Sequence, residues 1–261
     1  MNLPDPYKEG RRRNFSRAAS TYDASGEIQG RIGRILLELI PRDIPGNFIC
    51  DLGCGTGLHT QSLSEIFPHA EIHAVDLSPG MIAEAEKRSY SGKVHFLAAD
   101  MEGEAWRGAH YDLIFSNLAV QWALDPGRLL RNISRSLAPG AYLALSLFLQ
   151  GTYGELRQIF LENGLEVSQP PTLLSGKNVG ALLFEAGLRP MFQSEKKETE
   201  WRGDLLSILR NVRDSGTAVG LKEKLLPKKM AALEKAYRQK YADVQGLPLT
   251  WQYGLYLCRK I

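Results

Sequence analysis

Short apolar runs alternate with stretches of helical periodicity from about residue 47 to residue 148. Strands are expected where the runs are rich in aliphatic and aromatic residues, at 48–51, 71–76, 94–98, 111–116 and 141–148. Helices are expected where apolar positions recur every three or four residues, at 58–67, 79–88 and 125–137, the last ended by Pro139-Gly140. This alternation predicts an α/β fold, in which a parallel sheet lies between two layers of helices and the ligand crevice lies at the carboxyl ends of the strands.

The alternation loosens after residue 150. Helices are expected at 153–163 and 179–186, a strand with charged faces at 189–201, a helix-rich stretch at 203–241 and a last strand at 249–258. A helical insertion before the last strand fits a lid over the substrate cleft, although helical padding on the sheet edge would give the same pattern. We therefore expect one domain over 1–261, with an N-terminal helical flap at 1–40 and a helical lid at 203–245.

A loop with three glycines follows the first expected strand, in the sequence Asp51-Leu52-Gly53-Cys54-Gly55-Thr56-Gly57. Glycines let the backbone reverse sharply and let a ligand approach the main chain. The dinucleotide fingerprint G-x-G-x-x-G is not matched, because the third glycine comes one residue early. Asp51 would repel a pyrophosphate and attract a cationic ligand, such as the amine of an amino acid. The alternative is an ordinary strand-to-helix turn with glycines for packing.

Two further carboxylates end the next strands. Asp76 lies about 20 residues beyond the glycine loop and is followed by Leu77, and an acid there can accept hydrogen bonds from both ribose hydroxyls. Asp100 could accept a hydrogen bond from an adenine amino group, with Met101 packing on the ring. One such aspartate is more often a loop cap. Three in register after a glycine turn predict an adenosine ligand with an attached amino acid.

The glycine loop resembles motif I of class I S-adenosylmethionine (SAM) methyltransferases. Four further stretches narrow the resemblance to the malonyl-acyl-carrier-protein O-methyltransferases of early biotin synthesis: R-N-F-S-R-A-A-S-T-Y-D at 13–23, S-N-L-A-V-Q-W at 116–122, G-T-x-x-E-L at 151–156 and L-P-L-T-W at 247–251. The resemblance covers nearly the whole chain. Residues 222–240 match least well, and Trp251 stands where the family usually has Tyr.

The resemblance implies a Rossmann-like sheet of seven mostly parallel strands with the last strand antiparallel, and SAM as the cofactor. It also implies that Asn117 and Leu118 present backbone groups to the cofactor, that Gln121 and Trp122 shape the acceptor pocket, and that Tyr22 closes over the methionine end. Trp122 could instead be a core aromatic residue on Leu129, and Tyr22 a packing residue of the flap. The expected cofactor-binding residues are thus Tyr22, Asp51, Gly53, Gly55, Gly57, Asp76, Leu77, Asp100, Met101, Asn117 and Leu118.

Methyl transfer is an in-line displacement for which a protein supplies mainly position and desolvation. A carboxylate acceptor needs no general base, because its pKa is about 4, whereas an amine or a phenol usually does. No histidine is expected at the acceptor position, which favours an acceptor that is already anionic. An arginine could hold the malonyl carboxylate with two hydrogen bonds. The candidates are Arg157, Arg210 and Arg213, although the last two could point to solvent.

Composition places further bounds on the chain, which is 44% hydrophobic and 23% charged with no apolar run long enough to span a bilayer. Its start has no apolar segment of the secretory type. Three cysteines are too few for a disulfide framework and lack the spacing of a zinc site, so we expect no metal and a cytoplasmic location.

The net charge is +3, and basic residues gather at 11–17 and at 202–240. Such clusters suit an acidic partner, here acyl-carrier protein with a malonyl thioester, although a solvated helical surface is the commoner explanation. On the expected lid, Lys222, Lys224, Lys228 and Lys229 would steer the carrier. We expect a monomer without nucleic-acid or membrane partners.

Two other functions remain open at this point. One is methylation of another small molecule of the quinone or carboxylate type on the same scaffold. The other is a non-catalytic SAM-binding or RNA-associated module, which the basic segment suggests. Against it, the loop after the fourth expected strand is S-N-L-A rather than the N-P-P-Y or D-P-P-Y of many RNA methyltransferases.

Overall fold

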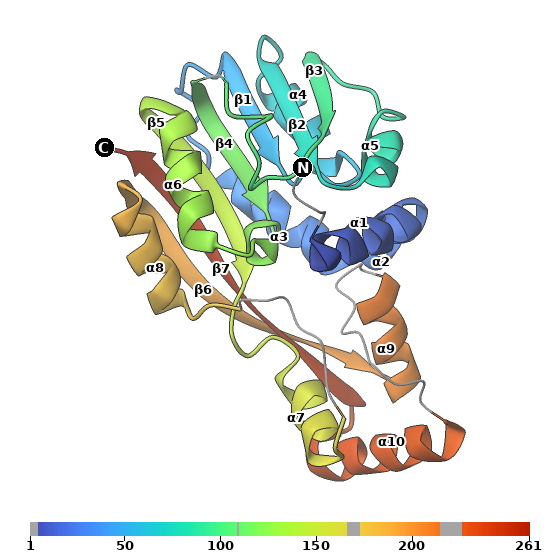
Figure 1. The fold of residues 1–261 in the computed structure, drawn as a ribbon. Coiled ribbons are helices and arrows are strands. Elements are labelled where there is room, and N and C mark those ends of the chain that lie inside the picture. The colour runs from blue at the N-terminus through green and yellow to red at the C-terminus, as the bar shows by residue number, and fades with distance from the viewer. Residues whose placement is uncertain (1–4, 109, 166–172, 215–225) are drawn as a thin grey trace.

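The fold was analysed in a computed structural model, which describes residues 5–108, 110–165, 173–214 and 226–261. One sheet runs through it in the order β3-β2-β1-β4-β5-β7-β6 (Figure 1). Its strands are β1 (Phe48–Leu52), β2 (Glu71–Asp76), β3 (Lys93–Ala98), β4 (Tyr111–Asn117), β5 (Leu137–Phe148), β6 (Leu188–Arg202) and β7 (Leu247–Lys260). Strands β1 to β5 pair in parallel, and β7 runs antiparallel between β5 and β6. The predicted seven-stranded sheet with an antiparallel last strand is confirmed.

Helices precede and connect these strands: α1 (Pro6–Ala18), η1 (Ala19–Thr21), α2 (Tyr22–Ser25), α3 (Glu27–Glu38), α4 (Leu58–Ile66), α5 (Pro79–Ala85), η2 (Val120–Trp122), α6 (Pro126–Ser136), α7 (Gly154–Glu162), α8 (Gly176–Glu185), α9 (Leu205–Asp214) and α10 (Pro227–Tyr241). Two starts follow directly from the sequence, because each has a side-chain cap followed by proline. Ser78 accepts a hydrogen bond from the Met81 amide at the start of α5, and Asp125 accepts one from the Arg128 amide at the start of α6.

The predicted start of β5 was wrong. Pro139 and Gly140 do not end the preceding helix but lie within the strand, which begins at Leu137. Leu137 pairs with Tyr111, and the register then shifts before Tyr142 pairs with Leu113. Such a bulge lets a strand hold a proline and a left-handed glycine (Gly140, φ 76°) that regular pairing would exclude.

Both faces of the central strands are buried. Leu113 and Phe115 of β4 join a core cluster that includes Ile32 of α3, whereas Ile114 points the other way into a cluster that includes Ile133 of α6. This explains why the central strands have continuous apolar sequences rather than alternating ones. Helix α3 is therefore part of the core. Within the predicted flap at 1–40, the described residues before α3 lie outside these core clusters. The role of that part as a flap stays a prediction.

Strands β6 and β7 are long, and α7, α9 and α10 gather around one end of this pair (Figure 1). Tyr237 of α10 is buried and donates a hydrogen bond to the Pro248 carbonyl at 2.6 Å. Helix α10 contacts α7, α9 and β7, and α9 contacts α2 and β6. The action of residues 203–245 as a lid stays a prediction, and its part at 215–225 lies outside the described residues. Within the described residues, we find no helix with the length and apolarity needed to cross a membrane.

The unusual Trp251 is fully buried in β7, and its ring centroid lies 5.1 Å from that of Phe148 and 4.6 Å from that of Tyr153. We predict that Trp251→Ala lowers the free energy of unfolding by ~3–5 kcal/mol, because it leaves a large cavity among packed rings. Urea denaturation would measure this. The control is Phe184→Ala, since Phe184 is 77% exposed and its loss should change stability by less than about 0.5 kcal/mol. Equal losses in the two variants would contradict the prediction.

Candidate active site

The loop between β1 and α4 adopts a left-handed backbone at every second residue. Gly53, Gly55 and Gly57 have φ of 84°, 54° and 77°. A Cβ at Gly53 would overlap the side chain of Ala119, whereas a Cβ at Gly55 would meet nothing within 4 Å. The first glycine therefore allows two loops to touch, and the second leaves the main chain open to the space above it.

Asp76 at the end of β2 is joined to this loop. Its Oδ2 accepts a hydrogen bond from the Gly55 amide at 3.0 Å, and its Oδ1 accepts one from the Ser78 amide at 2.8 Å. Burial raises the pKa of this carboxyl. The two amides bind the ionised form and partly offset that effect. Because each carboxylate oxygen has two lone pairs, Asp76 can still accept further hydrogen bonds from a ligand.

Asp100 follows β3 and, unlike Asp76, forms an ion pair with a lysine. Its Oδ1 accepts a hydrogen bond from the Glu102 amide at 2.9 Å, and its Oδ2 lies 2.6 Å from the ammonium of Lys8 on α1. The same ammonium lies 2.6 Å from the Glu102 carboxylate. One lysine thus bridges two acids and ties α1 to the end of the sheet.

Asp51, by contrast, lies beneath the loop. It is 1% exposed and accepts a hydrogen bond from the Thr60 hydroxyl at 2.5 Å. Burial raises its pKa to about 7, and the hydrogen bond from Thr60 partly offsets this. Asp51 lines a small cavity that shares Tyr22, Gly53 and Asn117 with the main cavity described next.

The main cavity lies at the carboxyl ends of β1, β2 and β4, beneath α1. It contains eleven of the residues expected from the sequence: Tyr22, Gly53, Gly55, Asp76, Leu77, Asp100, Met101, Asn117, Leu118, Gln121 and Trp122. Five other expected residues do not line it: Asp51, Gly57, Arg157, Arg210 and Arg213. Residues that the sequence did not indicate complete the wall, chiefly Lys8, Arg11, Phe15, Gln29, Glu102 and Phe148.

The three arginines expected to meet the substrate are exposed on α7 and α9. Helix α9 buries Leu205, Ile208 and Val212, so a helix of this periodicity places positions 210 and 213 off the buried stripe. The expected arginine role at these positions is therefore not supported by the cavity. Arg11 lines it instead, and its guanidinium carbon lies 3.3 Å from the ring centroid of Trp122.

Trp122 lies in the cavity wall, where its ring meets that of Phe15 edge-on at 5.9 Å between centroids. Next to it, Gln121 is 1% exposed and donates a hydrogen bond to the Leu118 carbonyl at 2.8 Å. Leu118 itself has φ of 52°, a conformation that costs energy in a residue other than glycine and often marks a functional loop.

Asn117 uses its side chain inside the protein. Its amide nitrogen donates to the Gln29 carbonyl at 3.1 Å, and its oxygen accepts from the Ser146 hydroxyl at 2.7 Å. The side chain thus connects α3 with β4 and β5. The expected contact of the backbone at Asn117 with the cofactor stays a prediction.

The N-terminal cover, defined here as residues 5–25, is fastened at three places. Lys8 pairs with the two acids after β3, and the Ser16 hydroxyl lies 2.8 Å from the Ser78 hydroxyl. Farther along, Asp23 accepts a hydrogen bond from the Thr56 hydroxyl of the glycine loop at 2.6 Å and pairs with Arg88. No residue of α1 is fully buried, so these polar contacts, together with the ring contacts of Arg11 and Phe15 with Trp122, hold it against the cavity.

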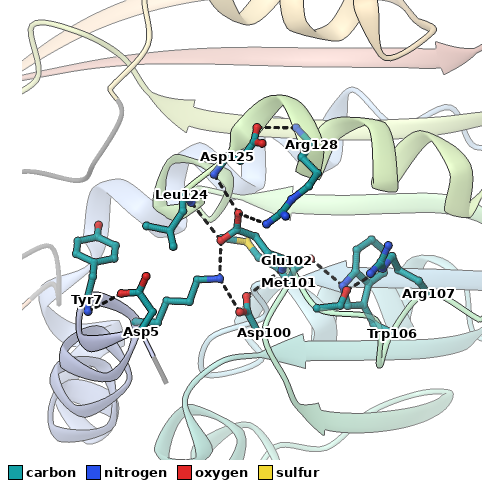
Figure 2. A network of polar contacts seen from close by, with 12 residues as sticks. Asp5, Tyr7, Asp100, Met101, Glu102, Trp106, Arg107, Leu124, Asp125 and Arg128 are labelled. Carbon is teal, nitrogen blue, oxygen red and sulfur yellow. Dashed lines mark hydrogen bonds and ion pairs between the residues drawn. The ribbon is translucent and has the colours of Figure 1, made fainter. Parts of the chain in front are cut away.

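Glu102 is the most connected residue that sequence reasoning missed (Figure 2). Its side chain is 3% exposed, and it accepts hydrogen bonds from the backbone amides of Leu124 and Asp125 at 3.1 and 3.0 Å. Arg128 lies 3.7 Å away. Glu102 therefore couples the loop after β3 to the start of α6 and to Lys8. The only sequence indication was an acid two residues after Asp100.

The donors and acceptors of the main cavity fit an adenosyl amino acid. Two carboxylates, Asp76 and Asp100, offer acceptors, and both side-chain amide atoms of Gln29 are buried with no hydrogen-bond partner among the described residues. Apolar groups of Val75, Leu77 and Met101 line the same space. Polar atoms that lack partners in a partly apolar cavity indicate a ligand with both kinds of surface.

Comparison with known proteins agrees with this chemistry. A family model described as a methyltransferase domain matches residues 50–145. Geranyl diphosphate C-methyltransferase from Streptomyces coelicolor superimposes with a TM-score of 0.62 at 15% identity, over 99% of this chain and all of that one, and so supports the fold. The fold and the cavity define an SAM-dependent methyltransferase of class I.

Malonyl-acyl-carrier protein O-methyltransferase from Hahella chejuensis is 32% identical over 95% of this chain and 89% of its own length. The protein of the same name from a Paenibacillus species is 30% identical over 98% of this chain and 99% of its own length. The chain therefore belongs to the malonyl-acyl-carrier protein O-methyltransferase family.

The ion pairs of Lys8 predict a measurable effect on the cover. Lys8→Met keeps most of the apolar stem but leaves the buried Glu102 with the more distant Arg128 as its cation, so we expect unfolding to become easier by ~1–3 kcal/mol and amide exchange in α1 to become faster. Urea denaturation and hydrogen exchange would measure both. Arg13→Met is the matched control, because Arg13 is exposed on the same helix. Unchanged exchange in Lys8→Met would refute the role of the bridge.

The raised pKa of Asp51 predicts a pH dependence of stability. Its pKa lies at about 7 in the folded chain against 3.8 for an ordinary aspartate, so the folded state holds more protons between these values. Stability from this group is complete at low pH and is lost as the pH rises through 7. Relative to Asp51→Asn, the parent should therefore lose up to ~3 kcal/mol between pH 5 and pH 8. Urea titrations at both pH values test this, and a constant difference would rule it out.

Proposed function

We propose that this chain transfers a methyl group from SAM to the free carboxyl of a malonyl group held as a thioester on acyl-carrier protein. The observation that supports this best is a single cavity with two kinds of wall. The glycine loop and the strand-end acids form one part, and the aromatic and cationic side chains of α1 and η2 form the other. Cofactor and acceptor would thus lie in one continuous space, as direct methyl transfer needs.

Asp76, Asp100 and the backbone around Gly55 are the groups that would hold SAM. Asp76 would accept hydrogen bonds from the ribose hydroxyls, and Asp100 would accept one from adenine while keeping its contact with Lys8. Asp51 would lie near the amino-acid part, where a nearby ammonium favours its ionised form. When bound, SAM supplies an electrophilic methyl group: its S–CH3 bond breaks with the electron pair left on sulfur while an acceptor oxygen forms the O–CH3 bond.

The walls around the acceptor favour this reaction by excluding water. Phe15, Trp122 and Phe148 are aromatic residues of the lining, and Phe15 comes from α1 itself. A malonyl carboxylate is ionised at neutral pH, so the protein has no proton to remove. Charge disappears as a carboxylate and a sulfonium react, and an environment with little water favours that change once binding energy has offset the desolvation of the ions.

Docking of the carrier belongs to the same proposal. Carrier proteins are acidic as a class, and the chain exposes Arg13 and Arg17 on the cover and Lys228 at the start of α10. The basic side chains of the cover lie on the element that closes the cavity, so they suit a carrier that delivers its thioester there. Lys222 and Lys224, which were also expected to take part, lie outside the described residues. A cytoplasmic location fits three buried free cysteines, and a monomer is part of the same proposal.

The test of the proposal is a methyl-transfer assay with malonyl-acyl-carrier protein, malonyl-CoA and a phenolic acceptor. We expect turnover with the carrier-bound substrate, weaker turnover with malonyl-CoA and none with the phenol. Preference for the phenol would exclude the proposal and favour a different small-molecule methyltransferase. Absence of turnover, together with binding of tRNA at physiological salt, would favour the RNA-associated alternative.

Cofactor binding gives a separate prediction. Asp76→Ala removes the acceptor expected at the ribose and also the acceptor for the Gly55 amide, so the Kd for SAM should rise at least tenfold. Calorimetry measures this directly. The control is Glu86→Ala. Glu86 is an exposed acid at the C-terminal end of α5, away from the Ser78 cap, and this variant should bind SAM like the parent. Equal Kd values for Asp76→Ala and the parent would contradict the assignment.

A further inference from the structure

The guanidinium of Arg11 has no carboxylate partner among the described residues. It lies on α1, and its guanidinium carbon is 3.3 Å from the ring centroid of Trp122 and 4.4 Å from that of Tyr7. Its Nε atom is buried and makes no hydrogen bond of standard geometry in the described part of the chain, and the neighbouring Tyr7 hydroxyl favours its charged form but is itself uncharged at neutral pH. Two aromatic rings thus fix the plane of a cation whose donors remain available.

The acids of the main cavity already have other partners. Asp100 and Glu102 share the ammonium of Lys8, and Asp76 accepts hydrogen bonds from two backbone amides. Among the described residues, Lys8 and Arg11 are the two cationic side chains in the lining. Only the second of these two has no carboxylate within ion-pair distance in the described structure.

A guanidinium in this position needs an anion from elsewhere. Burial disfavours its charged form and lowers the pKa of Arg11 to about 10, so it remains charged at neutral pH. Stacking on aromatic rings compensates for part of the lost hydration. A bidentate carboxylate would supply the rest, because its two oxygens match the fork of N–H donors.

Resting on the function proposed above, we propose that Arg11 binds the acceptor carboxylate and so selects a free acid over its ester. Trp122 and Tyr7 hold the guanidinium plane, and the carboxylate keeps oxygen lone pairs for the methyl carbon while the N–H donors bind the others. The ester that forms carries no charge and loses the ion pair. The same residue would therefore favour binding of the substrate and release of the product.

The experiment compares the parent with Arg11→Gln, Arg11→Lys and the exposed control Arg42→Gln, which lies outside the cavity lining and outside the cover. The acceptor probes are S-malonyl-N-acetylcysteamine and its methyl ester, added by calorimetry to protein saturated with S-adenosylhomocysteine. We expect the parent to bind the acid ten- to a hundredfold more tightly than the ester, and Arg11→Gln to lose that preference. Arg11→Lys should recover part of it, because it keeps the charge without the fork. Arg42→Gln should behave like the parent.

Two outcomes would overturn the role of Arg11. One is an acid preference in Arg11→Gln equal to that of the parent. The other is a tenfold loss of S-adenosylhomocysteine affinity in the same variant, since that would indicate a general disturbance of the cover. Turnover is scored separately with malonyl-acyl-carrier protein. A parent that binds the acid through Arg11 but does not methylate the malonyl substrate would overturn the proposed function and leave the carboxylate site in place.

Discussion

The left-handed turn after β1 is the constraint on which the active-site region depends. Gly53, Gly55 and Gly57 adopt positive φ at alternate positions, which other residues adopt only at a cost. This turn presents the Gly55 amide to Asp76. It also places Thr56 where its hydroxyl donates a hydrogen bond to Asp23 of the cover. A change of backbone at one of these glycines would thus disturb the cavity floor and the contact that closes it.

The floor and the cover of the cavity are stabilised by different forces. The floor belongs to a sheet with both faces buried, so it is held by hydrophobic packing on two sides. No residue of α1 is fully buried, and the cover is held by ion pairs and hydrogen bonds of Lys8, Ser16 and Asp23 and by ring contacts of Arg11 and Phe15 with Trp122. Polar contacts at a partly exposed surface contribute little each. A rigid floor under a weakly held cover suits an enzyme that must admit a cofactor and an acceptor and then exclude water.

The sequence was sufficient for the sheet, the glycine loop and the strand-end acids, because each depends on local pattern. Apolar runs located the strands, and Asp76 and Asp100 follow two of them directly. Residues whose role depends on the position of α1 could not be found in this way. Tyr7, Arg11 and Phe15 share one face of that helix at a four-residue spacing, but the sequence does not show that this face turns toward the strand ends. The same gap explains why Arg210 and Arg213 were expected at the substrate, since their common helix face was clear but its direction was not.

Charge balance in the cavity explains why an anionic acceptor suits this particular lining. Lys8 is neutralised by two acids, and Asp76 faces the place proposed for the ribose, so Arg11 is left as the lining cation without an acid partner in the described structure. A cationic cofactor adds further positive charge to the same space. An acceptor that carries a carboxylate would place one negative charge near both positive charges, and methylation would remove that charge again. The guanidinium would then be unpaired beside a neutral ester, and exchange of this ester for a new carboxylate would restore the ion pair.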